Sequence, residues 1–178
     1  VMWKNKTLLL DAEAIRRVVR RIGHECLERN RGLEDAVFIG IETRGEPLAE
    51  RLARQVDAIE GVKVEVYALD VTAFRDDEKA APAQSHLPAI DVDGKLVLLV
   101  DDVLYTGRTV RSALNAIMAM GRPRAIQLAV LVDRGHRELP IRADYVGKNV
   151  PTAEREDVAV ELLEIDGNDR VWLREKAE

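Results

Sequence analysis

Residues 97–109 read Val-Leu-Leu-Val-Asp-Asp-Val-Leu-Tyr-Thr-Gly-Arg-Thr, so two carboxylates and a hydroxyl-rich turn directly follow a run of apolar residues. The run at 96–100 is short, continuous and apolar, which is typical of a strand buried on both faces of a parallel sheet. We therefore expect the chain to leave the sheet at Asp101. From Val110 onward apolar residues recur at helical spacing, so the turn at 105–109 is predicted to open a helix.

This stretch, called the signature segment below, suits a phosphorylated sugar. Unpaired amides and the positive end of the dipole meet at a helix N-terminus, where a 5′-phosphate can bind. The hydroxyls of Thr106 and Thr109 can add to those contacts, and Gly107 lets the backbone approach a ligand closely. Asp101 and Asp102 can accept hydrogen bonds from two ribose hydroxyls. The plainer alternative is that this acidic pair ends a strand and caps a helix.

Strands and helices alternate along the rest of the chain. Helices are expected at 11–30, 47–56 and from 110, and strands at 36–41, 62–69, 96–100 and 125–132, followed by short strands near 145, 158–165 and 171–173. This order predicts an α/β fold with a mainly parallel central sheet flanked by helices on both faces. Residues 72–94 show little periodicity, so a mobile loop over the active site is expected there.

The composition is that of a single globular domain. The chain has 178 residues, of which 47% are hydrophobic, and no linker divides it, so residues 1–178 are predicted to form one domain. No apolar run is long enough for a transmembrane helix, and no membrane association is expected. Cys26 is the single cysteine, which excludes an intrachain disulfide and agrees with a reducing cytoplasm. The net charge of −5 means that any nucleic-acid site must be local.

A second candidate anion loop lies at Thr43, Arg44 and Gly45, directly after the predicted 36–41 strand. A glycine beside an arginine offers backbone amides and a planar set of donors that suit pyrophosphate. Taken alone, the tripeptide reads as an ordinary loop with a solvated arginine. Both this loop and Asp101 fall at carboxyl ends of strands, where parallel sheets bind their ligands.

Residues 132–140 follow another predicted strand and are dense in hydrogen-bonding groups. Asp133 and Arg134 are therefore candidates for contacting a ligand, with a polar surface loop as the alternative. If the loop at 43–45 binds pyrophosphate, Mg²⁺ is the expected metal, because that group carries several negative charges. No cluster of His, Cys or Glu in the sequence supplies a dedicated metal site, so the ion would be held mainly through substrate and water.

The signature segment resembles the phosphoribosyl pyrophosphate (PRPP) motif of the type I phosphoribosyltransferases, and Tyr105 is what the pyrimidine operon regulator branch carries. Together with residues 43–45, the stretch 67–77 with Phe-Arg-Asp-Asp at 74–77, and the run from 126 to 149, it makes nearly the whole chain similar to the bifunctional PyrR family. The resemblance implies a type I phosphoribosyltransferase fold and the conversion of uracil and PRPP to UMP and pyrophosphate. It also implies UMP-dependent binding to pyrimidine operon leader mRNA, transcription attenuation, and a homodimer or higher homo-oligomer.

The resemblance assigns the residues of the catalytic site. PRPP or nucleotide binding is expected at Thr43, Arg44, Gly45, Asp101, Asp102, Val103, Leu104, Tyr105, Thr106, Gly107, Arg108 and Thr109. The catalytic residues are expected to be Asp101 and Asp102, which are better placed to hold ribose than to attack it. A general-base role for either stays open. The resemblance implies that the base-binding segment follows the predicted 125–132 strand, which makes Asp133 and Arg134 the expected base-binding residues.

Basic residues gather at two places that could meet RNA. Arg17, Arg20, Arg21 and His24 stand at positions i, i+3, i+4 and i+7, so they share one face of the first predicted helix. A second cluster consists of Arg137, Arg142 and Lys148. Arginine suits a phosphate backbone. The alternative is a solvated helix face, which would leave a purely metabolic nucleobase phosphoribosyltransferase, or a ligand sensor that has lost turnover.

Overall fold

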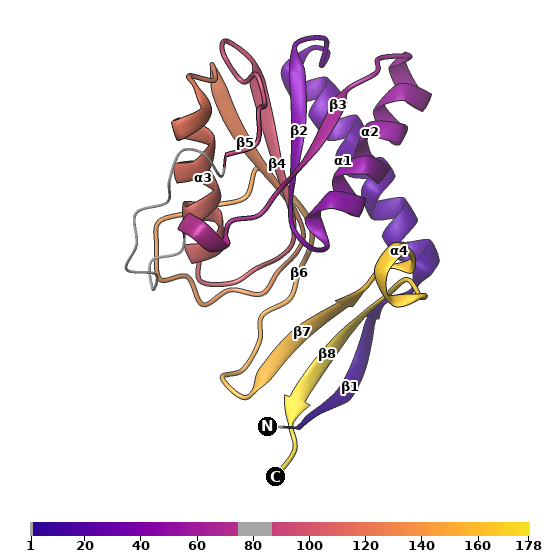
Figure 1. Cartoon of the computed structure of the whole chain (residues 1–178). Coiled ribbons are helices and arrows are strands. Elements are labelled where there is room, and N and C mark those ends of the chain that lie inside the picture. Colours follow the sequence, from indigo (N-terminus) through magenta and orange to yellow (C-terminus); the bar gives the residue numbers. More distant parts are fainter. Residues whose placement is uncertain (1, 75–86) are drawn as a thin grey trace.

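The computed structural model describes residues 2–74 and 87–178, and these form two sheets with helices around the larger one (Figure 1). The elements follow in the order β1 (Trp3–Leu10), α1 (Ala12–Asn30), β2 (Ala36–Ile41), α2 (Gly45–Glu60), β3 (Glu65–Leu69), the 3-10 helix η1 (Thr72–Phe74), β4 (Leu96–Leu104), α3 (Arg108–Met120), β5 (Ala125–Asp133), β6 (Tyr145–Asn149), β7 (Glu156–Glu161), α4 (Leu163–Asp166) and β8 (Arg170–Lys176). The central sheet is parallel, with strand order β3-β2-β4-β5-β6.

Helices cover both faces of the central sheet, as the sequence predicts. Successive side chains of a strand point to opposite faces. Phe38 and Leu98 therefore pack with buried residues of α1 and α2, whereas Ile39 and Leu99 pack with α3. The α/β prediction is confirmed, and the continuous apolar runs of the central strands reflect burial on both faces.

The helix ends follow local sequence signals. Helix α1 begins after Asp11, whose carboxylate accepts the N–H of Ala14 at 2.8 Å, so this residue acts as the N-cap. Helix α2 begins at Gly45, two residues before the proline at which the sequence predicts its start. It ends at Glu60, and the next residue, Gly61, caps it with a φ of 69°. These two helices pack side by side on one face of the sheet (Figure 1).

Strand β4 is longer than predicted. Its expected end at Asp101 is wrong, because the strand continues to Leu104. β5 runs beside it throughout, with Asp101 paired to Val130 and Leu104 paired to Asp133. The two carboxylates of the signature segment therefore lie on the last residues of a strand, where neighbouring backbone fixes them, and not in a loop.

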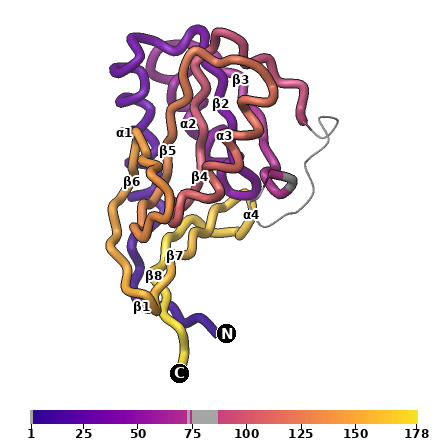
Figure 2. Tube along the Cα trace, turned by 90° about the vertical axis from the view of Figure 1, so that its left-hand side faces the viewer, coloured from indigo at the N-terminus to yellow at the C-terminus, as the bar shows by residue number. Residues whose placement is uncertain are grey.

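A small antiparallel sheet, with order β1-β8-β7, lies beyond the carboxyl ends of the central strands (Figure 1). Figure 2 shows it extending away from the central sheet with both termini at its far end. The prediction of a strand over 158–165 is wrong in its second half, because β7 ends at Glu161 and α4 follows. β1 was not predicted, since its partner β8 lies more than 160 residues away in the sequence.

The predicted loop at 72–94 is more ordered at its ends than expected. Thr72–Phe74 forms a 3-10 helix, and the side chains of Ile90 and Val92 are buried against the core on the α3 face. Residues 75–86 lie outside the described part of the chain, and so do Arg75, Asp76 and Asp77 of the stretch that resembles PyrR proteins.

No helix within residues 2–74 and 87–178 has the length and apolar character needed to cross a bilayer.

Candidate active site

The acidic pair lies within the last four residues of β4. Asp101 is 8% exposed, and its Oδ1 accepts the N–H of Asp102 at 2.8 Å. In the same way Oδ1 of Asp102 accepts the N–H of Val103 at 2.8 Å. Burial and the charge of Asp102 raise the pKa of the Asp101 carboxyl well above its ordinary value. Asp102 is more exposed, so its second oxygen is the better placed acceptor for a ligand.

The turn after β4 opens α3, as the sequence predicts. Gly107 has a φ of 93°, which favours glycine, and the helix begins at the next residue. The hydroxyl of Thr106 accepts the N–H of Arg108 at 3.2 Å, and the Thr106 carbonyl accepts the N–H of Glu138 at 2.9 Å. A hydrogen bond from the 133–141 loop therefore holds this turn in place. The side chain of Leu104, by contrast, is buried in the core, so only its backbone can face a ligand.

The loop after β2 packs directly against the same edge of the sheet. A Cβ atom added to Gly45 would lie 2.4 Å from the carbonyl oxygen of Val100, and one added to Gly40 would lie 2.4 Å from the carbonyl oxygen of Gly45. Only glycine permits this approach. Gly45 is therefore held against Val100, the residue before Asp101, so the loop at 43–45 ends beside the strand that carries the acidic pair.

Arg44 is paired with a residue that sequence reasoning missed. Its Nε and Nη2 atoms donate to the two carboxylate oxygens of Asp166 in α4, at 3.1 and 2.6 Å. This pair raises the pKa of Arg44 and lowers the pKa of Asp166, and Asp102 also contributes to the rise at Arg44. No local signal marks Asp166, because it lies 122 residues further along the chain.

The two candidate base-binding residues make structural contacts. Arg134 is 7% exposed and donates to the side chains of Thr152 and Asp157, at 3.3 and 2.8 Å, and to the carbonyl of Glu156 at 2.6 Å. Asp133 accepts the N–H of Gly135 at 3.0 Å and forms an ion pair with Arg137. Every guanidinium nitrogen of Arg134 thus has a protein acceptor, and both side chains shape the loop at this edge.

Arg137 and Tyr105 also belong to this edge. Arg137, predicted to bind RNA, donates to the carbonyl oxygens of Tyr105 at 2.8 Å and Ile141 at 2.9 Å. The ring of Tyr105 is 45% exposed and meets the ring of His136 edge-on, with 5.9 Å between centroids. The structure therefore places Arg137 beside the signature segment and away from the basic face of α1.

The remaining basic residues lie around α1 and β6. Arg17, Arg20, Arg21 and His24 are all exposed on α1. The Arg21 guanidinium donates to the carbonyl oxygens of Val146 and Gly147, at 3.2 and 2.7 Å, which joins this helix to β6. β6 carries Lys148, and Arg142 precedes it; both are exposed. The structure thus brings the α1 face and the second cluster, apart from Arg137, to one edge of the central sheet.

The described residues contain no group of three or more His, Cys, Asp and Glu side chains arranged to hold a metal. Asp101 and Asp102 are the carboxylates of the signature segment, so they are its candidates for oxygen ligands to a metal. This donor set fits a metal that keeps most of its ligands from substrate and water.

Comparison with known proteins gives full-length matches. Residues 6–165 match the family described as phosphoribosyl transferase domain. The "Bifunctional protein PyrR" of Pelotomaculum thermopropionicum is 56% identical over 184 residues, covering 99% of this chain and 100% of that protein. The protein of the same name from Brevibacillus brevis is 57% identical over 176 residues, covering 96% and 98% of the two chains.

Solved structures share the architecture. A hypoxanthine phosphoribosyltransferase from Staphylococcus aureus superposes with a TM-score of 0.72 at 20% identity, covering 94% of this chain and 90% of that one. The hypoxanthine phosphoribosyltransferase of Trypanosoma cruzi, solved in complex with the product IMP, gives a TM-score of 0.70 at 21% identity, with coverages of 95% and 90%. At these identities the likeness shows the fold alone.

Proposed function

The chain belongs to the phosphoribosyltransferase family and, within it, to the PyrR proteins, and from this membership we propose that it has two activities. It transfers phosphoribose from PRPP to uracil, which yields UMP and pyrophosphate. With UMP bound, it binds pyrimidine operon leader mRNA and regulates transcription by attenuation. The observation that supports the enzymatic half is the close approach of Gly45 to the Val100 carbonyl, because it brings the end of the loop at 43–45 next to the residue before Asp101.

The sugar phosphate binds at the end of β4. The backbone of residues 103–108 and the hydroxyls of Thr106 and Thr109 surround the N-terminus of α3, which favours a 5′-phosphate. Asp102 and Asp101 accept the ribose hydroxyls. Positive charge builds on the ring as the C1′ bond breaks, as in glycoside cleavage, so carboxylates at this place stabilise the transition state.

Pyrophosphate leaves toward the loop after β2. Arg44 supplies donors to the leaving group, and the N–H groups in the first turn of α2, which begins at Gly45, add to them. Mg²⁺, when bound, neutralises part of the pyrophosphate charge, and its oxygen ligands come mainly from substrate and water. Asp133 and Arg134 act by fixing the loop against which the base lies.

Turnover of uracil by the purified chain tests the enzymatic half. With uracil, PRPP and Mg²⁺ present, we expect UMP and pyrophosphate in equal amounts. Hypoxanthine is the matched comparison, since the fold is shared with hypoxanthine phosphoribosyltransferases. Product from hypoxanthine and none from uracil would overturn the assignment of the base, and no product from either would overturn the transferase.

RNA binding is supported by the exposed basic face on α1 and its contact with β6. A gel-shift titration with leader RNA tests it, with and without UMP. Preferential, UMP-dependent binding over unrelated RNA of equal length is expected. The protein is proposed to act in the cytoplasm as a homodimer or higher homo-oligomer, which sedimentation of the same sample can examine.

A purely metabolic nucleobase phosphoribosyltransferase is the alternative. One observation favours it. Arg21 donates to two carbonyl oxygens of β6 and, at 2.6 Å, to the carboxylate of Glu25, so part of the basic face stabilises the fold. Uracil turnover without preference for leader RNA would establish this alternative.

A further inference from the structure

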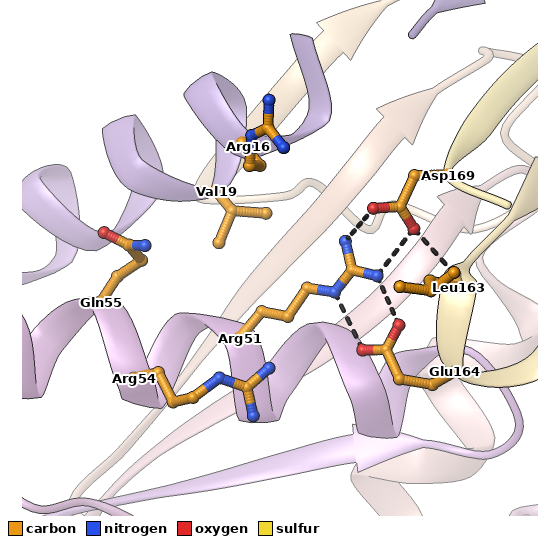
Figure 3. A pocket seen from close by; sticks show the side chains of 8 residues that line it. All are labelled: Arg16, Val19, Arg51, Arg54, Gln55, Leu163, Glu164 and Asp169. Carbon is orange, nitrogen blue, oxygen red and sulfur yellow. Dashed lines mark hydrogen bonds and ion pairs between the residues drawn. The ribbon is translucent and has the colours of Figure 1, made fainter. Parts of the chain in front are cut away.

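Segment 163–169, which holds α4, is joined by three arginine–carboxylate pairs to α2 and the residue before it. Arg44 at the start of α2 holds Asp166, and Arg51 further along the same helix holds Asp169 and Glu164. Figure 3 shows the Arg51 guanidinium between its two carboxylates, with Leu163 beside them. Arg51 is 14% exposed at its side chain, so this second contact is a structural clamp.

The Arg44 contact uses only one edge of the guanidinium. Nε and Nη2 donate to Asp166, and Nη1 has no protein acceptor within residues 2–74 and 87–178. A guanidinium has five N–H groups in a rigid plane, so the edge formed by Nη1 and Nη2 can hold a second anion at the same time. The Arg44 side chain is 33% exposed, so a ligand from solvent can reach it.

Asp166 is itself held in place. Its Oδ2 also accepts the N–H of Leu162 at 2.8 Å, just after β7 ends. The carboxylate is therefore oriented before any ligand binds, and it fixes the long Arg44 side chain in one plane. An arginine ordered in this way loses less side-chain entropy when it binds an anion.

We propose that Asp166 is a positioning residue for the pyrophosphate group: it holds one edge of Arg44 so that the other edge meets the diphosphate. This role rests on the proposed function, since Arg44 is taken there as a pyrophosphate contact. The small sheet thereby contributes to the site through α4, without touching the substrate itself.

Asp169 provides a matched control in the same segment. It accepts two bonds from Arg51, at 2.7 and 3.1 Å, and its Oδ1 accepts the N–H of Leu163 at 2.8 Å. Asp166 makes the same kinds of contact, with two bonds from an arginine and one from a backbone N–H. Arg51, however, lies seven residues further along α2, about 10 Å from Arg44 along the helix axis. Asp169→Asn thus weakens a similar arginine–carboxylate contact without altering a contact of the loop at 43–45.

Calorimetric titration with Mg²⁺-pyrophosphate and Mg²⁺-PRPP compares Asp166→Asn with Asp169→Asn. We expect Asp166→Asn to weaken both affinities about tenfold and to raise the KM for PRPP while the KM for uracil stays unchanged. Asp169→Asn should leave all of these at wild-type values. In an Arg44→Gln background, Asp166→Asn should have no further effect, because the side chain that it orients is gone.

Three results would overturn the role of Asp166. Wild-type or tighter pyrophosphate binding by Asp166→Asn would show that the carboxylate is idle or competes with the ligand. Equal weakening by Asp169→Asn would show a general effect of the segment on stability. If Asp166→Asn still weakens binding in the Arg44→Gln background, Asp166 does not act on the ligand through Arg44. Wild-type protein that binds pyrophosphate but fails to convert uracil would instead contradict the proposed reaction alone.

Discussion

The guanidinium carbon of Arg134 lies 4.0 Å from the centroid of the Tyr105 ring, while the same guanidinium is hydrogen-bonded to Asp157 of β7. A cation over an aromatic face is attracted to it, the more so when water is excluded. Tyr105 belongs to the signature segment, and β7 belongs to the small sheet. Arg134 therefore couples the turn of the signature segment to the small sheet, which explains why a residue in a polar loop is buried.

Replacing Arg134 with methionine tests this coupling. The change keeps much of the side-chain volume but removes all of its hydrogen bonds and leaves the Glu156 carbonyl without this donor. We expect the free energy of unfolding to fall by about 2 to 3 kcal/mol. Urea denaturation measures it. Arg174→Met is the control, because Arg174 also bonds Asp157, at 2.6 Å, but its side chain is 30% exposed, so a smaller loss is expected. An equal loss in both variants would contradict the coupling.

Replacing Asp101 with asparagine should stabilise the fold and impair catalysis. Burial raises the pKa of this carboxyl, so the unfolded chain ionises at lower pH than the folded one, and stability falls as pH rises between the two pKa values. Asparagine removes that penalty and keeps an oxygen for the Asp102 N–H. We expect a gain of about 1 kcal/mol near neutral pH, a Tm rise of about 2 to 4 °C, together with a loss of turnover.

Thermal unfolding at several pH values checks this, with Asp102→Asn as the comparison. Asp102 is more exposed than Asp101, so its replacement should impair turnover without the gain in Tm. If Asp101→Asn instead unfolds at a lower temperature than wild type near neutral pH, the buried carboxylate stabilises the protein, and the expectation is wrong.

Replacing Gly45 with alanine should disrupt the loop after β2. The new methyl group would lie 2.4 Å from the backbone oxygen of Val100, which cannot rotate away. We expect a loss of at least about 2 kcal/mol in stability and weaker PRPP binding. Gly61→Ala is the control: nothing lies within 4 Å of its added Cβ, but its φ of 69° is strained, so a cost of about 1 kcal/mol and normal PRPP affinity are expected. Normal PRPP binding by Gly45→Ala would refute the tight packing.

The thiol of Cys26 should be inert in the folded protein. Its side chain is 1% exposed, and burial raises its pKa to about 12. A thiol reagent at about pH 8 should therefore label no cysteine in native protein and one per chain in denaturant. Rapid labelling of the native protein would mean that α1 opens locally, since Cys26 lies on the buried face of this helix.

The sequence predicts the central sheet well because its signals are local. Continuous apolar runs mark β2 and β4, Asp11 marks the start of α1, and glycine marks the turn before α3. The signature segment could be assigned for the same reason: its carboxylates, hydroxyls and glycine are neighbours in the chain.

What the sequence could not supply depends on contacts between distant residues. β1 and β8 pair across almost the full length of the chain, and no periodicity in either reveals its partner. The Asp166 contact to Arg44 and the burial of Arg134 arise in the same way. A charged residue in a polar loop looks available for ligands until the fold shows which acceptors surround it.

Arg20 and Arg21 should separate RNA binding from stability, although they are neighbours on α1. Arg20 is exposed and has no protein partner in the described parts of the chain, whereas Arg21 donates to two carbonyl oxygens of β6. Arg20→Gln should weaken leader RNA binding and lower the slope of log affinity against log salt by about 1, with an unchanged Tm. Arg21→Gln should lower both the affinity for leader RNA and the Tm.

Arg124→Gln, which breaks an exposed pair with Asp35 at 3.0 Å, is the control and should leave RNA affinity intact. Unchanged RNA affinity in both α1 variants would mean that the basic face serves solubility alone, and the chain would then be a metabolic transferase.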